Sequence, residues 1–431
     1  MMDPLVQRTL AAVWHPCTQM KHMEQAPPLA IAAGDGPWLI GTDGRRYLDL
    51  ISSWWVNLFG HNEPRIKAAI KDQLDKIEHV LLAGCTHTPV VELSERLAAL
   101  TGLGHAFYAS DGASATEIAL KMSAHYWRNL GRPEKNQFMS LQNGYHGETV
   151  GALSVTDVAL FKDQYAPLLR PSASLPSPDF RLAEEGESAT DYARRCARAL
   201  EQHLAQHADT TAALILEPLV QGAAGMAMYD PLYLTLAREI CDRHEVHLIA
   251  DEIAVGFGRT GTMFACERAG ITPDFLCLSK GITGGYLPLS CVLTTDAVYQ
   301  AFYGDETARG FLHSHSYTGN PLACRAALAV LDIFAQDDVI AQNRAKAARF
   351  TELMAELAEH ARVRHFRQLG MIWAFDVKDA EADFPLRFHR AALERSMLLR
   401  PIGNTVYFMP PYCIDETQMK LAVGACLQLL G

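Results

Sequence analysis

Lys280 and Asp251 are the two residues whose surroundings point most directly to chemistry. Asp251 follows the apolar run 246–250, Lys280 follows the run 275–279, and a glycine-containing turn comes after each. Such runs predict short buried strands. The carboxyl ends of neighbouring parallel strands meet at one edge of a sheet, where open α/β folds bind their ligands. We therefore expect an amine and a carboxylate at a common ligand-binding edge.

An amine and a carboxylate placed in this way suit pyridoxal phosphate. That cofactor needs a lysine for its Schiff base and a carboxylate beside its pyridinium nitrogen. A lone lysine at a strand end is more often simply solvated, and Asp251-Glu252 could equally begin a helix. Glycines within 281–285 nevertheless let the backbone approach a ligand closely. Burial would also lower the pKa of the lysine and leave its amine nucleophilic.

Two further turns could complete such a site. Residues 110–117 lie between an expected strand and an expected helix, and a helix N-terminus offers N–H groups to a phosphate. Residues 143–147 carry Tyr145, whose ring could stack on a flat cofactor. Taken alone, the first segment is an ordinary capping sequence and the second an ordinary turn.

Two other motifs could suggest a metal site or a dinucleotide-binding loop, but neither fits the required pattern. His313 and His315 have no third ligand at a spacing typical of zinc, so no metal is expected. Residues 256–261 do not match the dinucleotide-binding loop, which argues against a nicotinamide enzyme.

Composition limits the class of protein. The 431 residues, about half of them apolar, suffice for a large domain and a smaller one. A net charge of −11 argues against nucleic-acid or anionic-membrane partners. The ten cysteines are scattered without a C-x-x-C pair, which suits a reducing compartment. With no signal peptide and no membrane-spanning apolar stretch in the sequence, we expect a soluble, cytoplasmic protein.

Strands and helices alternate over residues 100–300, which predicts an α/β fold with a mostly parallel, helix-covered sheet. We expect a large domain over 61–325 and a smaller α+β domain built from 1–60 and 326–431. A hairpin turn is expected at 41–44. The main expected helices cover 64–82, 90–100, 115–130 and 322–334, and the main expected strands 106–108, 212–216, 372–375 and 405–408.

Three segments together resemble the class III pyridoxal-phosphate aminotransferases. They are Ala250–Gly261, Pro273-Asp274 and Leu278–Gly281, and the resemblance runs from Trp14 to about Tyr412. It implies the fold type I architecture and a homodimer with active sites at the subunit interface.

A finer resemblance lies in Trp14-His15-Pro16, Ser52–Trp55, Asn143–Gly147, Arg400-Pro401 and Tyr407–Tyr412. These segments are similar to members that move an amino group from S-adenosylmethionine to 8-amino-7-oxononanoate in biotin biosynthesis. The product would be 7,8-diaminononanoate, formed by ping-pong kinetics through pyridoxamine phosphate.

The resemblance implies a role for each matching residue. Lys280 would carry the cofactor and shuttle the proton, Asp251 would bind the pyridine nitrogen and Tyr145 would cover the ring. The phosphate would be held by the backbone of Gly112 and Ala113, and by Ser316 from the neighbouring subunit. Substrate would be bound by Trp54, Tyr407, Arg400 with its forked contact to a carboxylate, Arg259, Cys17 and the backbone of Ser314.

Three positions depart from the family pattern. Cys17 stands where well-known members have a tyrosine that shapes substrate binding. Ala113 replaces a serine, for which Ser114 could compensate, and Ser316 replaces a threonine. Because Cys17 lies where the donor is recognised, lysine stays open as the amino donor.

Two broader alternatives also stay open. Another class III aminotransferase would act on an ω-amine such as ornithine or 4-aminobutyrate. A non-catalytic cofactor-binding protein on the same fold is disfavoured because both Lys280 and Asp251 are present.

Overall fold

The computed structural model describes residues 3–431, which divide into two compact units. The smaller unit comprises the chain up to Glu63 together with Ala347–Gln368 and Ile372–Gly431, and the larger comprises Pro64–Lys346 and Leu369–Met371. The larger unit thus continues past residue 325, the expected end of the large domain. The reason is that α12 (Pro321–Gln336) packs against α4 (Pro64–Leu74) and α5 (Thr88–Thr101).

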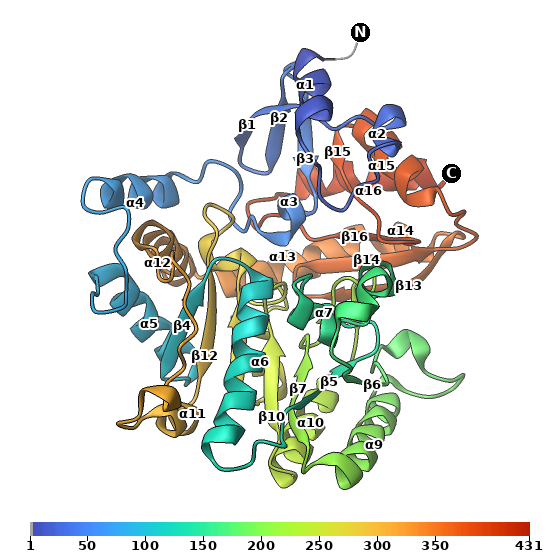
Figure 1. Cartoon of the computed structure of the whole chain (residues 1–431). Coiled ribbons are helices and arrows are strands. Elements are labelled where there is room, and N and C mark those ends of the chain that lie inside the picture. Colours follow the sequence, from blue (N-terminus) through green and yellow to red (C-terminus); the bar gives the residue numbers. More distant parts are fainter. Residues whose placement is uncertain (1–2) are drawn as a thin grey trace. The chain divides into compact units, whose positions relative to one another are not determined.

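The larger unit is built on a seven-stranded sheet with the strand order β4-β12-β11-β10-β7-β5-β6 (Figure 1). Only β12 is antiparallel to its neighbours, so the predicted mostly parallel α/β sheet is confirmed. In chain order the strands are β4 (His105–Ala109), β5 (Gln137–Leu141), β6 (Ala173–Leu175), β7 (Thr211–Leu216), β10 (His247–Asp251), β11 (Phe275–Leu278) and β12 (Ser290–Thr294). A two-stranded ribbon pairs β8 (Val220–Gln221) with β9 (Ala227–Met228).

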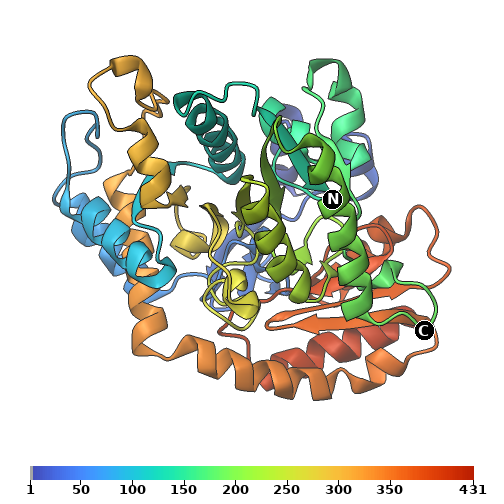
Figure 2. The same cartoon turned by 90° about the horizontal axis from the view of Figure 1, so that it is seen from below.

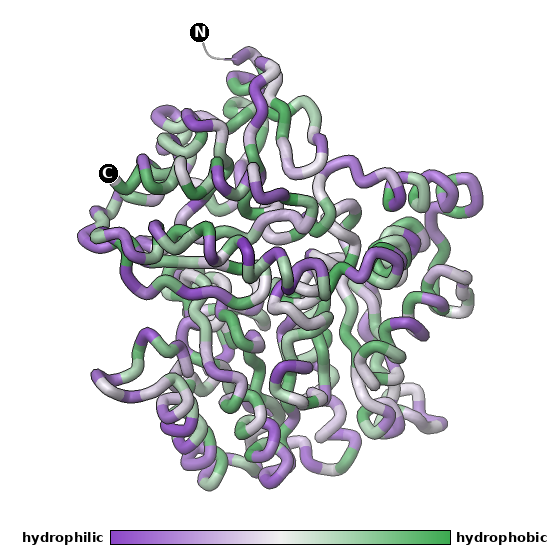
Figure 3. The backbone as a smooth tube through the Cα atoms, turned by 180° about the vertical axis from the view of Figure 1, so that it is seen from behind, coloured by the Kyte–Doolittle hydropathy of each residue, from purple (hydrophilic) through white to green (hydrophobic). Residues whose placement is uncertain are grey.

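Burial explains why the central strands were recognisable in the sequence. Every residue of β7, β10, β11 and β12 is buried, and strands covered on both faces appear as continuous apolar runs. The interior strands are accordingly coloured mostly hydrophobic in Figure 3. Helix α6 (Gly112–Asn129) lies across one face of the sheet (Figure 1) and contributes Ile118 and Met122 to a core that includes Ile249.

The remaining helices of the larger unit surround the sheet. Helices α5 and α12 lie side by side near the β4 edge (Figures 1 and 2). The others are α7 (Val150–Val155), α8 (Ala159–Lys162), α9 (Ala189–His207), α10 (Leu232–Arg243), α11 (Asp296–Phe302) and the first part of α13 (Val339–Leu353). The helix predicted over 64–82 was too long, because α4 ends at Leu74 and the side chain of Gln73 then binds the carbonyl of Ile77.

The smaller unit contains two sheets. One has the order β1-β2-β3-β15, with β1 (Ile31–Asp35), β2 (Trp38–Gly41), β3 (Arg46–Asp49) and β15 (Met397–Leu398). The other has the order β13-β14-β16, with β13 (Val363–Leu369), β14 (Ile372–Val377) and β16 (Thr405–Phe408). The predicted hairpin joins β2 to β3, with Gly44 at a φ of 80°. Because β15 pairs with β3, segments from the two ends of the chain share a sheet.

Short and medium helices complete the smaller unit. They are α1 (Pro4–Ala12), α2 (His22–Gln25), α3 (Ser52–Trp55), the end of α13, α14 (Ala355–Glu359), α15 (Phe384–Glu394) and α16 (Glu416–Leu430).

We expect Ile249→Ala to lower the free energy of unfolding by about 2–5 kcal/mol, because it opens a cavity beneath α6. Leu130→Ala, at a half-exposed position of the same unit, should change stability by less than about 0.5 kcal/mol. Denaturant titration of both variants checks this. If both variants lost the same small amount of unfolding free energy, Ile249 would not belong to the core.

Candidate active site

The carboxyl ends of three neighbouring strands bring together the titratable side chains of the site. Strands β7, β10 and β11 run parallel, with Leu216 beside Ala250 and Asp251 beside Cys277. Glu217 follows β7 directly and Lys280 follows β11 by two residues. The predicted meeting of Asp251 and Lys280 at one sheet edge is therefore confirmed, and Glu217 joins them.

Asp251 is a buried carboxylate, 4% exposed, that is held at both oxygens. Its Oδ1 accepts a hydrogen bond from the backbone N–H of Ile253 at 3.1 Å, and its Oδ2 lies 2.7 Å from Nδ1 of His146. A carboxylate can only accept, so Nδ1 is the donor. Nε2 of His146 is buried without a partner among the described residues.

His146 contacts Oδ2 of Asp251, and the negative charge of Asp251 also acts on the amine of Lys280. Hydrogen bonds from a backbone N–H and from the imidazole of His146 hold the carboxylate in place. A buried charge is costly unless it is paired. The site therefore suits a ligand that brings a positive charge to Asp251, as a protonated pyridine nitrogen does.

Lys280 begins a short 3-10 turn with a φ of 43°, in the left-handed region. Its removal from water lowers the pKa of its amine, and the negative charges of Asp251 and Glu217 oppose that shift. An amine with a lowered pKa holds more of its unprotonated, nucleophilic form near neutral pH.

Glu217 lies beside this pair and also fixes a turn. Its Oε2 accepts the backbone N–H of Tyr145 at 3.0 Å, and its Oε1 accepts that of Gly222 at 2.9 Å. Burial raises the pKa of Glu217 to about 7; His146 and the two N–H bonds oppose this shift, whereas Asp251 adds to it. Glu217 therefore exchanges a proton near neutral pH while holding Tyr145 in place.

Tyr145, predicted to cover the cofactor ring, is partly buried on the turn after β5. Its hydroxyl donates to Oε1 of Glu148 at 2.9 Å, and its ring packs edge-on against Phe161 with centroids 5.6 Å apart. The backbone bond to Glu217 and these side-chain contacts fix the orientation of the ring.

The predicted phosphate turn forms the start of α6. Asp111 is the N-cap and accepts the N–H of Ser114, so Gly112 and Ala113 are the first residues of the helix. A Cβ on Gly112 would come within 3.0 Å of Ile253, so only glycine fits without adjustment. The hydroxyl of Ser114 donates to Asp111 at 2.8 Å. That hydroxyl is therefore engaged within the cap rather than replacing the serine that Ala113 lacks.

The loop that carries Ser314 and Ser316 is tied to the end of β4. His315 Nε2 lies 3.0 Å from the hydroxyl of Ser110, and the hydroxyl of Thr318 donates to the carbonyl of Tyr108 at 2.7 Å. Both serines are exposed. Their roles toward substrate and a neighbouring subunit's phosphate stay predictions.

The smaller unit gathers four of the predicted substrate residues around one cavity of about 640 Å³. They are Cys17, Trp54, Arg400 and Tyr407. The guanidinium of Arg400 lies 5.1 Å from the ring centre of Trp54, and its Nη2 donates to the carbonyl of Cys17 at 3.4 Å. No acidic residue lines this cavity, which suits a ligand with a carboxylate and an apolar body.

Arg259 differs from the other predicted substrate residues. It is fully buried in the larger unit, where its carbonyl accepts the N–H of Met371 at 2.8 Å. Its contribution to substrate binding stays a prediction.

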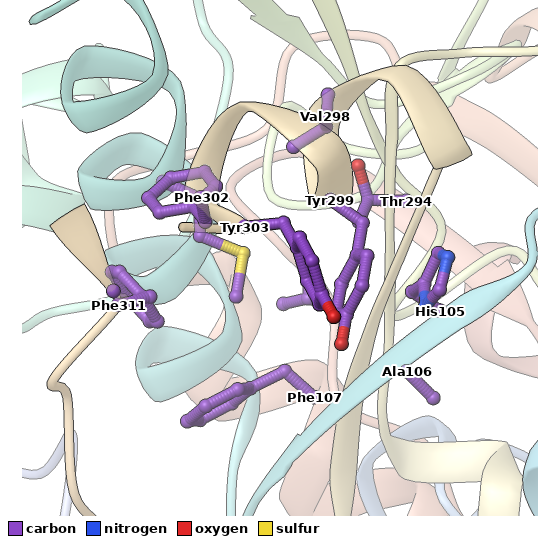
Figure 4. Close-up of a pocket in the computed structure, with 12 residues that line it drawn as sticks. His105, Ala106, Phe107, Thr294, Val298, Tyr299, Phe302, Tyr303 and Phe311 are labelled. Carbon is purple, nitrogen blue, oxygen red and sulfur yellow. The ribbon is translucent and has the colours of Figure 1, made fainter. Parts of the chain in front are cut away.

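A second cavity, of about 360 Å³, lies beside β4 and α11 (Figure 4). Phe107, Tyr299, Phe302, Tyr303 and Phe311 surround it, and none of the residues assigned to the reaction reaches it. Its lining is largely apolar and contains no cysteine, serine, lysine or carboxylate.

Two other kinds of feature are absent from the described part of the chain. No group of three or more metal-ligating side chains occurs within 3–431. No helix in that range is long and apolar enough to cross a membrane.

Sequence reasoning missed His146 and Glu217. His146 looked like an ordinary turn residue. Its contact with Asp251 forms only because the fold brings two segments that are distant in the sequence together. Glu217 carried a usable signal, since it ends an apolar strand just as Asp251 does.

Glu217→Gln should change how stability depends on pH. In the folded state the pKa of Glu217 is raised from 4.5 to about 7, so the folded protein binds the proton more tightly than the unfolded chain does. This preference stabilises the wild-type fold fully below about pH 4.5, and the stabilisation is lost as pH rises through 7. The glutamine variant should therefore gain stability relative to wild type by about 3 kcal/mol between pH 4.5 and 8. Unfolding of the apoprotein at several pH values measures this difference. A difference that does not vary with pH would refute the assignment.

Comparisons with known proteins identify the family. Residues 19–430 match the model of the family Aminotransferase class-III. The adenosylmethionine-8-amino-7-oxononanoate aminotransferase of Helicobacter pylori is 46% identical over 99% of this chain and 98% of its own length. The corresponding enzyme from Geobacter sulfurreducens is 42% identical over 95% of this chain and 94% of its own.

Solved structures give the same result. The crystal structure of the Methanocaldococcus jannaschii adenosylmethionine-8-amino-7-oxononanoate aminotransferase superimposes with a TM-score of 0.93 at 36% identity, covering 99% of this chain and 98% of its own. A PLP-bound amine transaminase from an uncultivated Pseudomonas species has a TM-score of 0.90 at 35% identity, covering 96% and 97%. The family predicted from the motifs around Asp251 and Lys280 is confirmed, and the chain belongs to the class III aminotransferases.

Proposed function

We propose that this protein uses pyridoxal phosphate to transfer an amino group from S-adenosylmethionine to 8-amino-7-oxononanoate, giving 7,8-diaminononanoate for biotin biosynthesis. The relatives from H. pylori, G. sulfurreducens and M. jannaschii are named for this reaction. A cytoplasmic homodimer, with Ser316 reaching the neighbouring subunit's cofactor, belongs to the same proposal.

The observation that carries the proposal is the sheet edge on which Asp251, His146, Glu217 and Lys280 meet. Its donor set fits pyridoxal phosphate: a buried carboxylate for the ring nitrogen, an amine with a lowered pKa, and a helix N-terminus for the phosphate. When bound, that cofactor supplies an aldehyde that accepts an amino group and a ring that takes up electrons.

The chain's own residues then handle the protons. Asp251, kept in place by His146, holds a proton on the ring nitrogen. Lys280 Nζ would take the proton from the α-carbon of the donor, hold it and release it again within the site. Tyr145, fixed by Glu217 and Glu148, limits the movement of the ring. Since one site serves donor and acceptor in turn, ping-pong kinetics follow.

Trp54, Tyr407 and Arg400 are proposed to recognise the substrates. Arginine forms two parallel hydrogen bonds with a carboxylate, which suits the acid end of the acceptor. An aromatic face both attracts a cation and covers methylene groups, so Trp54 suits a sulfonium donor as well as an aliphatic chain. Cys17, beside Arg400, gives the cavity a smaller side chain than tyrosine would and leaves lysine as the alternative donor.

The amino donor can be identified in a single half-reaction. Holoenzyme mixed with S-adenosylmethionine should lose the absorbance of its lysine-bound cofactor, whereas lysine should leave it unchanged. Loss with lysine alone would assign the donor to lysine. Turnover of an ω-amine with 2-oxoglutarate, and no 7,8-diaminononanoate, would overturn the proposed reaction.

Lys280→Ala should abolish turnover, and undiminished activity would remove Lys280 from the mechanism.

Arg400→Leu should raise KM for 8-amino-7-oxononanoate by about 10- to 100-fold, since it removes charged hydrogen bonds to the substrate. The donor half-reaction with S-adenosylmethionine should be less affected, because the acceptor's long-chain carboxylate is absent from that step. Arg395→Leu removes another exposed arginine of the same unit and serves as the control. Equal KM values for the Arg400 variant and wild type would show that the carboxylate is bound elsewhere.

A further inference from the structure

The short segment α3 (Ser52–Trp55) has an unusual backbone. Four consecutive residues have positive φ angles of 50°, 45°, 73° and 72°, and none of them is glycine. Ser53 and Trp54 lie in the left-handed helical region, with ψ angles of 53° and 45°. Side chains crowd the backbone in this region, so a run of such residues persists only when its surroundings hold it. Strain of this kind concentrates at functional sites.

One buried carboxylate supplies much of the support. Asp49, the last residue of β3, is fully buried. Its Oδ1 accepts the backbone N–H groups of Ser53 at 2.9 Å and Ile51 at 3.3 Å, and its Oδ2 accepts the hydroxyl of Ser53 at 2.7 Å. Behind the carboxylate, Nε2 of His61 lies 3.1 Å from the same Oδ2. Asp49 thus forms hydrogen bonds with Ile51, which precedes the turn, and with Ser53, the second residue of the turn.

The two ends of the turn are anchored to the segment that contains β16. The hydroxyl of Ser52 donates to the carbonyl of Met409 at 2.8 Å. The indole N–H of Trp55 donates to the hydroxyl of Tyr407 at 3.1 Å, and the two rings pack edge-on with centroids 6.2 Å apart. The turn therefore also fixes the direction of the Tyr407 hydroxyl.

The left-handed path sends two adjacent tryptophans to different environments. Trp55 is 6% exposed and packs inside, whereas Trp54 is 44% exposed and faces the guanidinium of Arg400. A relaxed turn would change the direction of Trp54 relative to Arg400 and break the bond from Trp55 to Tyr407. The geometry of the cavity around Arg400 thus depends on the conformation of these four residues.

We propose that Asp49 is a positioning residue for substrate recognition, because its carboxylate holds the left-handed turn that presents Trp54 to Arg400 and orients Tyr407 through Trp55. This inference rests on the proposed binding of the acceptor by Trp54, Arg400 and Tyr407. Asp49 itself touches no substrate; it acts through the turn.

The test compares Asp49→Ala, Asp49→Asn and the double variant Asp49→Ala/Ser53→Gly. In the alanine variant, KM for 8-amino-7-oxononanoate should rise at least about tenfold, since the turn loses three hydrogen bonds. Affinity for pyridoxal phosphate should stay unchanged. Asparagine keeps an oxygen for the two N–H groups, so its effect should be smaller. Glycine adopts positive φ readily, so the double variant should recover most of the loss.

Asp376→Ala is the matched control. Asp376 is also a buried aspartate of the smaller unit that bonds a histidine and a hydroxyl, those of His365 and Thr405; unlike Asp49 it also pairs with a buried arginine, Arg367, at 2.9 Å. Its removal should lower stability, and so reduce the folded fraction and the apparent kcat, while KM stays unchanged. Hydrogen exchange of residues 50–57 should speed up in Asp49→Ala and slow again in the double variant.

The outcomes separate this inference from the proposed reaction. Unchanged exchange over 50–57 in Asp49→Ala, or faster exchange with unchanged KM, would overturn the positioning role. An equal rise in KM for Asp376→Ala, or no recovery by Ser53→Gly, would likewise reduce Asp49 to a general stabilising residue. If wild type does not convert 8-amino-7-oxononanoate, the proposed reaction fails, and the same KM comparison is made with the acceptor that wild type does use.

Discussion

The burial of the Asp251 carboxylate is the constraint on which the site depends. Taking a carboxylate out of water is costly unless an opposite charge or strong hydrogen bonds replace the solvent. His146 and the N–H of Ile253 supply hydrogen bonds to the two carboxylate oxygens. A cationic ring nitrogen completes the arrangement, so the free energy spent on burying Asp251 favours the protonated form of a pyridine ligand.

The other titratable groups of the site follow from the same burial. Lys280 and Glu217 leave water at the same sheet edge, which lowers the pKa of the amine and raises that of the carboxyl group. Both shifts favour the neutral forms of these groups, so the charge of Asp251 stays the dominant one near the ring nitrogen. The apolar strands β7, β10 and β11 make these pKa shifts possible. Every residue of the three strands is buried, so the polar side chains at their carboxyl ends are also removed from water. Rigidity comes from Glu217, whose bonds to Tyr145 and Gly222 join two loops.

The sequence predicted the sheet and its two central site residues because that information is local. Apolar runs followed by glycine-containing turns mark buried strands and their ends, which is enough to bring Asp251 and Lys280 to one edge. His146 could not be found in this way, since its bond to Asp251 joins residues far apart in the chain. The role of Asp49 was also hidden, because Ser52–Trp55 contains no glycine to signal positive φ. The capping bond from Ser114 to Asp111 likewise depends on atomic geometry rather than residue type.

The most direct test of this account is the protonation state of the bound cofactor's ring nitrogen. Wild-type protein loaded with pyridoxal phosphate labelled with ¹⁵N in the ring should show a protonated nitrogen by NMR up to alkaline pH. Asp251→Asn should lose that proton, and His146→Leu should lose it at a lower pH than wild type, because an unsupported Asp251 holds a proton more readily itself. An unprotonated ring nitrogen in wild type at neutral pH, or the same protonated signal in Asp251→Asn, would contradict the account.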